Sequence, residues 1–262
     1  MKKHMIHDID QETIFISDDK LFYTIEGEGE FCGFPSVFMR MSMCNLTCVG
    51  FQSESAPHGC DSYISWSVKN KMTFHEIFDL MESIPPLSDS SILQHLKGGA
   101  ILKLTGGEPL IQQKQLIKFM ESFVERYQFT PTIDFETNAT IMPHYHWVDK
   151  YNATFTTSPK LSSNGDPREK TYKRDVLAWH AGNGSGFKFV VQDSTDLLEI
   201  WRDYVNDGYI NVEKNRIWLM PCAGSRDEHI EVAPTVAEWA KTLGVKFSPR
   251  LHLLIWDLAL KV

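Results

Sequence analysis

The sequence lacks any long hydrophobic run. No apolar stretch among its 262 residues approaches the roughly 20 residues that a membrane-spanning helix requires. The first residues, Met1-Lys2-Lys3-His4, are followed by acidic side chains rather than by an apolar segment, so we expect no signal peptide. Together these absences predict a cytoplasmic protein without a membrane partner.

Positive charge is also scarce. The chain has 26 Lys and Arg against 34 Asp and Glu, which gives a net charge of −8. The basic residues are scattered, and this pattern disfavours direct binding to nucleic acid. Repeats, low-complexity tracts and internal linkers are missing as well, so we predict a single domain over residues 1–262 with an ample core.

Cysteine is present at only five positions, and their distribution is uneven. Cys44, Cys48 and Cys60 lie in one polar, turn-rich loop over residues 42–62, and Cys32 lies just upstream. A reducing cytoplasm argues against disulfides, so thiols gathered in a loop indicate metal or redox chemistry.

Two kinds of metal site are compatible with the cysteine loop. A structural zinc site normally has four ligands, for which His58 or Cys32 would have to supply the fourth. Three thiolates suit an iron–sulfur cluster that keeps one iron open to a ligand from outside the protein. The loop alone leaves both interpretations open.

The rest of the chain alternates between strand and helix patterns, and polar or glycine motifs follow the strands. This alternation predicts an α/β fold, a partial TIM-type barrel of about six parallel strands with helices outside and the working edge at the strand carboxyl ends. A helix is expected over 235–243 and a last short strand over 251–256. The expected parallel strands are residues 36–41, 100–104, 132–136, 153–157, 186–191 and 216–220.

A glycine-rich turn, Gly106-Gly107-Glu108-Pro109, follows the strand over 100–104. Its two glycines let the backbone approach a small polar ligand, and Glu108 could accept hydrogen bonds from an amine. Alone it would be an ordinary strand-to-helix turn. It is expected to neighbour the cysteine loop, and this pairing favours a cluster over zinc.

Arg40 lies in an apolar strand just before the cysteine loop. A buried arginine needs a partner, commonly a carboxylate or a phosphate. Its spacing alone favours a structural ion pair.

With these features together, the sequence resembles the radical S-adenosylmethionine (SAM) superfamily and, within it, the 7-carboxy-7-deazaguanine synthases of queuosine biosynthesis. The superfamily features are Cys-x3-Cys with a third cysteine and the later Gly-Gly-Glu-Pro. The narrower resemblance is carried by residues 22–29, Phe38-Met39-Arg40, Cys60-Asp61-Ser62, Trp66, Glu136-Thr137-Asn138, Ser158-Pro159-Lys160, Met220-Pro221 and Arg250-Leu251-His252.

The resemblance implies a 4Fe-4S cluster, SAM and Mg²⁺ as cofactors, and no catalytic residue beyond the radical that the cofactor holds. Cys44, Cys48 and Cys60 would hold the cluster, and Ser62 would help to bind magnesium. SAM contacts are implied for Gly106, Gly107, Glu108, Asn138, Ser158, Pro159, Lys160, Met220, Pro221, Cys222 and Ala223. Substrate contacts are implied for Ile25, Glu26, Gly27, Glu28, Arg40, Thr105 and the terminal carboxylate of Val262.

The implied reaction converts 6-carboxy-5,6,7,8-tetrahydropterin into 7-carboxy-7-deazaguanine by hydrogen abstraction, ring contraction and loss of ammonia. The resemblance also implies an electron donor such as flavodoxin or ferredoxin, and a homodimer. Another radical SAM enzyme, such as a glycyl-radical activase, is one alternative, although residues 25–29 and Arg40 argue against it. A non-enzymatic, zinc-stapled binding protein is another.

The sequence departs from the family pattern at four places. Eleven residues, 49–59, separate the second cysteine from the third where the family usually has two, which we interpret as an insertion. Glu26 and Met220 stand where glutamine is common, and Trp256 stands where some members have histidine.

Overall fold

The computed structural model describes residues 12–17, 21–85 and 88–259. Its strands form one ten-stranded sheet in the order β10-β9-β8-β7-β6-β5-β3-β1-β4, and β2 pairs with β3 outside this path. The strands are β1 (Thr13–Ile16), β2 (Phe22–Ile25), β3 (Pro35–Met41), β4 (Asn70–Thr73), β5 (Ile101–Gly106), β6 (Ile133–Thr137), β7 (Thr154–Thr157), β8 (Gly186–Val191), β9 (Ile217–Pro221) and β10 (Lys246–Phe247).

The six strands from β3 to β9, without β4, are parallel neighbours in the order in which the chain makes them. Strand order that follows chain order is the arrangement of a β/α barrel, whereas a doubly wound sheet reverses direction. Because the sheet ends at β4 and β10 and does not close, the predicted partial barrel of six parallel strands is confirmed.

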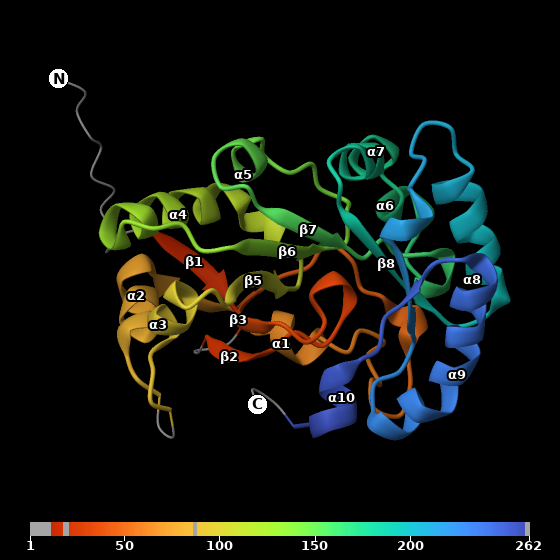
Figure 1. The fold of residues 1–262 in the computed structure, drawn as a ribbon, viewed down its shortest axis with the longest axis horizontal. Coiled ribbons are helices and arrows are strands. Elements are labelled where there is room, and N and C mark those ends of the chain that lie inside the picture. The colour runs from red at the N-terminus through yellow and green to blue at the C-terminus, as the bar shows by residue number, and fades with distance from the viewer. Residues whose placement is uncertain (1–11, 18–20, 86–87, 260–262) are drawn as a thin grey trace.

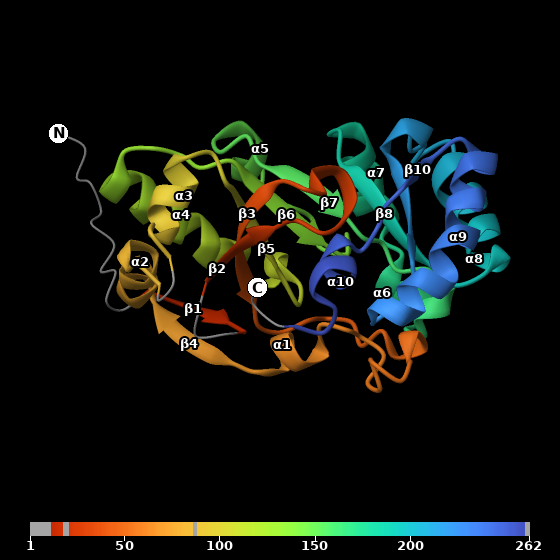
Figure 2. The same ribbon diagram turned by 60° about the horizontal axis from the view of Figure 1, so that its bottom comes forward.

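Helices cover both faces of this sheet, with α4, α5 and α7 on one face and α1 and α10 on the other (Figures 1 and 2). In the described ranges no helix combines the length and apolar character needed to cross a membrane. The helices are α1 (Tyr63–Ser67), α2 (Phe74–Glu82), α3 (Ile92–Lys97), α4 (Gln113–Tyr127), α5 (His146–Asp149), α6 (Arg168–Thr171), α7 (Arg174–Gly182), α8 (Ser194–Ile200), α9 (Arg226–Leu243) and α10 (Leu251–Trp256), with short turns η1 (Gly29–Phe31), η2 (Val49–Phe51), η3 (Pro109–Gln112), η4 (Ser162–Asn164), η5 (Trp201–Val205) and η6 (Lys214–Arg216).

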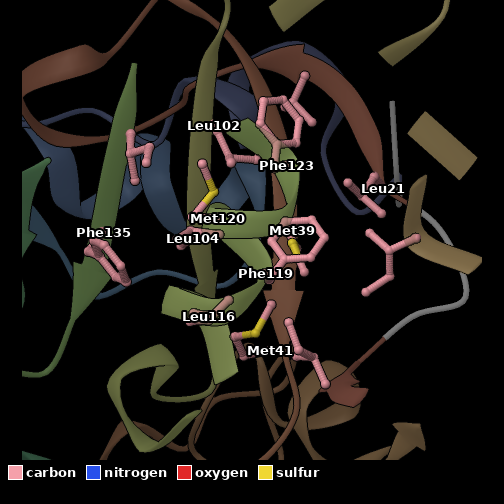
Figure 3. Packing of buried hydrophobic residues seen from close by; sticks show 14 of the residues in the cluster. Leu21, Met39, Met41, Leu102, Leu104, Leu116, Phe119, Met120, Phe123 and Phe135 are labelled. Atoms are coloured by element: carbon pink, nitrogen blue, oxygen red, sulfur yellow. The ribbon is translucent and has the colours of Figure 1, made fainter. Parts of the chain in front are cut away.

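The main hydrophobic core lies between the sheet and α4. Leu116, Phe119, Met120 and Phe123 recur at helical spacing on α4 and pack against the strands, among them Leu104 of β5 (Figure 3). Side chains alternate between the two faces of a strand. The faces of β5 and its neighbours that point away from this core are therefore free to carry polar groups.

Two predicted elements differ from the structure. Residues 251–256 form helix α10 rather than a strand, closed by bonds such as Leu254 N to the Arg250 carbonyl. A six-residue apolar run has no periodicity that separates helix from strand. Helix α9 begins at Arg226 rather than at residue 235, because Ser225 caps it and Pro234 lies inside the helix.

Candidate active site

The structure brings the three cysteines of the loop together. The thiols of Cys48 and Cys60 are hydrogen-bonded to each other, and Cys44 lies close enough to both for their charges to affect one another. Cys32 lies elsewhere, with its sulfur donating to the Gly27 carbonyl at 3.4 Å. The third thiol beside Cys44 and Cys48 is therefore that of Cys60.

The eleven-residue gap is an excursion that closes on itself. Gly59 adopts φ +88° and packs onto the backbone of Cys48 and Val49, where a Cβ atom would overlap both. At the outer end of the loop, Ser55 donates to the carboxylate of Glu228 at 3.0 Å. The chain thus leaves after Cys48 and returns beside it, which is the geometry of an insertion.

The donor chemistry of this loop suits a cluster. Burial raises the pKa of the Cys44 thiol to about 11, whereas the hydrogen bond from Cys60 lowers the pKa of Cys48. The positive charge of Lys160 favours the thiolate form of both. Among the described residues no three His, Cys, Asp or Glu side chains surround one point as ligands of a single metal ion. The thiolates of a cluster bind different irons, so three sulfurs on one shared loop fit that group.

The glycine-rich turn runs directly along the cysteine loop, as predicted. Gly107 N donates to the Met41 carbonyl at 3.0 Å and Glu108 N to the Met43 carbonyl at 2.9 Å. Gly106 has φ +107° and presses against the Met41 backbone. Both glycines are needed because the two backbones touch where any side chain would stand.

We expect Gly107→Ala to destabilise the protein by about 1–3 kcal/mol, the usual cost of overpacking. The new Cβ would overlap the Met43 carbonyl oxygen and crowd Trp66. Urea unfolding gives the free-energy change. Gly182→Ala is the matched control, because nothing lies within 4 Å of a Cβ there. Equal stabilities of the two variants would contradict the close contact.

Glu108 is fully buried and already has protein partners. Its carboxylate accepts from Leu110 N at 3.0 Å, Thr137 Oγ1 at 2.9 Å and Asn138 N at 2.8 Å. Burial raises its pKa to about 7. Glu108 thus ties the turn after β5 to the end of β6, and a contact from its carboxylate to SAM stays a prediction.

The other residues expected to contact SAM also lie at the carboxyl edge of the sheet. Asn138 follows β6, residues 158–160 follow β7, and residues 220–223 end β9. Lys160 Nζ donates to Ser158 Oγ at 2.8 Å. The set that the structure gathers at this edge comprises Gly106, Gly107, Glu108, Asn138, Ser158, Pro159, Lys160, Met220, Pro221, Cys222 and Ala223.

Arg40 and Thr105, both expected to contact substrate, are register partners across β3 and β5. The Arg40 guanidinium donates to Ser65 Oγ at 3.0 Å and lies over the Phe22 ring, 5.2 Å from its centroid. The ion pair favoured by its spacing does not form with any described residue. Its charge is therefore available for an anionic ligand.

Glu26, which takes the place of the family's glutamine, faces a buried lysine. Its Oε2 lies 2.9 Å from Lys103 Nζ, which donates to Asp134 at 2.6 Å. Burial raises the pKa of Glu26 although the Lys103 charge opposes it. Gly27 follows, and a Cβ there would overlap the ring of His252 on α10.

Glu28 joins a second set of buried charges. Lys188 of β8 donates to both Glu28 and Glu136, and Thr105 Oγ1 donates to Glu136 at 3.0 Å. Glu28 also accepts from Arg250 Nε at 2.8 Å. Two expected substrate residues, Glu28 and Thr105, thus belong to one polar network on the inner face of the sheet.

For the remaining residues expected in the site, the structure gives fewer contacts. Ser62 directly precedes α1 and its hydroxyl donates to Asp61 at 3.1 Å. Its role toward magnesium stays a prediction. Ile25 ends β2, 37% exposed. Val262 lies outside the described residues, and so its carboxylate stays a prediction as well.

The charged lining of the inner face was not predicted from the sequence. The signal was present, because lysine and carboxylate residues at alternate positions of apolar strands have no place in a hydrophobic core. Lys103, Asp134 and Lys188 were not named at all, and Glu136 and Arg250 were named only as carriers of the resemblance, without a role in the site.

A partial barrel of parallel strands with a three-cysteine loop and a glycine turn at its carboxyl edge defines a radical SAM enzyme. No protein-family model matches the chain. It is 28% identical over 239 residues to the 7-carboxy-7-deazaguanine synthase of Pyrobaculum aerophilum, covering 90% of this chain and 93% of that one. It is 28% identical over 242 residues to the synthase of Hyperthermus butylicus, with 90% and 91% coverage.

The fold matches the crystal structure of QueE from Escherichia coli with a TM-score of 0.56 and 19% identity, over 91% of this chain and 94% of that one. Over nine-tenths of its length the chain is thus similar to 7-carboxy-7-deazaguanine synthases, and it shares the fold of QueE.

Proposed function

We propose that this protein converts 6-carboxy-5,6,7,8-tetrahydropterin into 7-carboxy-7-deazaguanine as a radical SAM enzyme. The observation that carries the proposal is the meeting of the cysteine loop, the glycine turn and the charged inner face at one edge of the sheet. Nine-tenths of the chain is related to enzymes named for this activity.

The cysteine loop provides the cofactor site. Cys44, Cys48 and Cys60 would hold the cluster, and Lys160 would balance part of the negative charge of their thiolates. When bound, the cluster and SAM supply a 5′-deoxyadenosyl radical that removes a hydrogen atom from the substrate. The protein would orient SAM through the backbone of the glycine turn and of residues 220–223.

The inner face of the sheet provides the substrate site. Arg40 would hold an anionic group of the pterin, since its guanidinium is planar and always charged. Thr105 and the segment Glu26-Gly27 would orient the ring, and Ser62 would offer a hard oxygen to a magnesium ion at the substrate carboxylate. The surrounding charged residues are already paired, so they fix geometry without competing for the ligand.

Three features of its working state belong to the same proposal. A low-potential flavodoxin or ferredoxin would deliver the electron, two copies of the chain would form a homodimer, and the cytoplasm would keep the thiols reduced. The family resemblance supports the first two, and the clustered free thiols support the third.

Anaerobic reconstitution tests the proposal. The protein is supplied with iron, sulfide, SAM, a reductant and 6-carboxytetrahydropterin, and 5′-deoxyadenosine and the deazaguanine are measured. We expect both products to form together. SAM cleavage without turnover of the pterin would favour another radical SAM enzyme, such as a glycyl-radical activase. Stoichiometric zinc without iron and sulfide would favour a zinc-stapled binding protein.

A further inference from the structure

Each of the three thiols in the cysteine loop has a side-chain N–H donor of its own. The amide of Asn138 points to Cys44 Sγ at 3.9 Å. Two further donors come from other elements. The amide of Asn164 in η4 lies 3.6 Å from Cys48 Sγ, and the indole Nε1 of Trp66 in α1 lies 3.4 Å from Cys60 Sγ.

The first donor, Asn138, is held in its orientation by neighbours. Its Oδ1 accepts from Thr140 N at 3.1 Å and from Thr140 Oγ1 at 2.6 Å, and its amide donates to Asn45 at 2.9 Å. These contacts fix which end of the amide faces the loop, so the N–H side is turned toward Cys44.

The second donor, Asn164, is fully buried and equally constrained. Its Oδ1 accepts from Asp166 N at 2.9 Å, and Asp166 in turn accepts from Thr47 N and Cys48 N at 2.9 and 2.7 Å. One short segment therefore holds both the backbone of Cys48 and the donor to its sulfur.

The third donor is the simplest. An indole N–H can only donate, and within the described ranges that of Trp66 donates to the Cys60 sulfur alone. The carbonyl of Trp66 accepts from Met43 N at 2.9 Å, which anchors the residue to the start of the cysteine loop. A hydrogen bond from this N–H to the sulfur is stronger when the sulfur is a charged thiolate.

We propose that Trp66, Asn138 and Asn164 are positioning residues that set the reduction potential of the cluster through one N–H···S bond to each thiolate. The inference rests on the proposed function, since it requires the cluster. Reduction adds negative charge to the cluster and its sulfurs. Donors to sulfur stabilise that charge, so they raise the potential and make the electron easier to accept.

Trp66→Phe tests this most cleanly, because it removes the N–H and keeps most of the ring. We expect an unchanged iron and sulfide content and a roughly tenfold loss in the equilibrium constant for reduction. For one electron this is a shift of about 59 mV to more negative potential. The potential is measured by redox titration of the reconstituted protein, with the reduced cluster followed by electron paramagnetic resonance.

Trp239→Phe is the matched control, because Trp239 of α9 is partly buried and packs against a separate hydrophobic cluster that includes Phe189 and Leu219. Its potential should equal that of the wild type. Asn164→Ala is a second variant and is expected to shift the potential in the same direction. If Trp66→Phe binds less iron than the wild type, the potential of Asn164→Ala tests the inference instead.

A wild-type potential in both Trp66→Phe and Asn164→Ala would overturn the inference and leave the proposed function standing. A wild-type protein that takes up no cluster would overturn the proposed function and this inference with it.

Discussion

Replacing Cys60 by alanine is expected to abolish the cluster, its brown colour and all cleavage of SAM. The thiol of Cys60 lies against that of Cys48, and the Trp66 indole donates to its sulfur at 3.4 Å. Cys32 is not placed to substitute for it, because its sulfur donates to the Gly27 carbonyl. Loss of one of three thiolates leaves a second iron without a protein ligand.

Cys32→Ala is the matched control, since it removes a thiol of similar partial burial from the same part of the sequence. It should keep the iron content and SAM cleavage of the wild type. Cys44→Ala should behave like Cys60→Ala. The measurements are iron and sulfide content and 5′-deoxyadenosine after anaerobic reconstitution. Full SAM cleavage by Cys60→Ala together with its loss in Cys32→Ala would reassign the third ligand.

The sequence was sufficient to predict the six parallel strands and the edge at which the site lies. Each of these strands is an apolar run bounded by turn residues, so its burial can be predicted from the local sequence alone. The contact between the cysteine loop and the Gly106-Gly107 turn was also predictable. The loop follows β3 and the turn follows β5, and these two strands are neighbours in the sheet.

The partners of the buried charges were not predictable in the same way. Glu108 was expected to accept hydrogen bonds from an amine, and the hydrogen bonds that it accepts from Thr137 and Asn138 were not predicted. Lys103 and Lys188 meet carboxylates that lie far away along the chain. Such pairs depend on which strand faces which segment across the barrel, and no local pattern encodes that choice.

Arg250→Ala is expected to remove most of the activity and to destabilise the fold. Arg250 is 8% exposed, and its guanidinium joins three segments that the proposed function uses. It donates to Glu28 at 2.8 Å, and it also bonds Asp61, next to Cys60, and the carbonyl of Ala223. One side chain thus links the substrate segment, the cluster loop and the SAM segment.

The energetic cost comes mainly from Glu28. An uncompensated buried charge costs about 3–5 kcal/mol. Lys188 still faces Glu28 and the side chain of Asp61 is 44% exposed, so we expect the lower part of this range. The Michaelis constants for SAM and substrate should both rise, because both segments lose the same anchor.

The stability loss should depend on pH. Burial opposes ionisation of Glu28, but Lys188 and Arg250 outweigh it and hold its pKa well below the usual range. A carboxylate with a lowered pKa stabilises the folded state above its unfolded pKa of about 4.3, and this contribution is lost as the pH falls through the folded value. The gap between wild type and Arg250→Ala should therefore be widest near neutral pH and narrow below about pH 4.

Two variants separate the geometry of Arg250 from its charge. Arg250→Lys keeps the charge, but a single ammonium lacks the planar fork that reaches three acceptors, so it should recover stability more than activity. Arg202→Ala is the surface control, since that side chain is 69% exposed and its pair with Asp203 should contribute little to stability. Urea unfolding from pH 3 to 8 and steady-state kinetics give both quantities. Wild-type activity in Arg250→Lys would show that the charge alone suffices and that the three segments are held by other contacts.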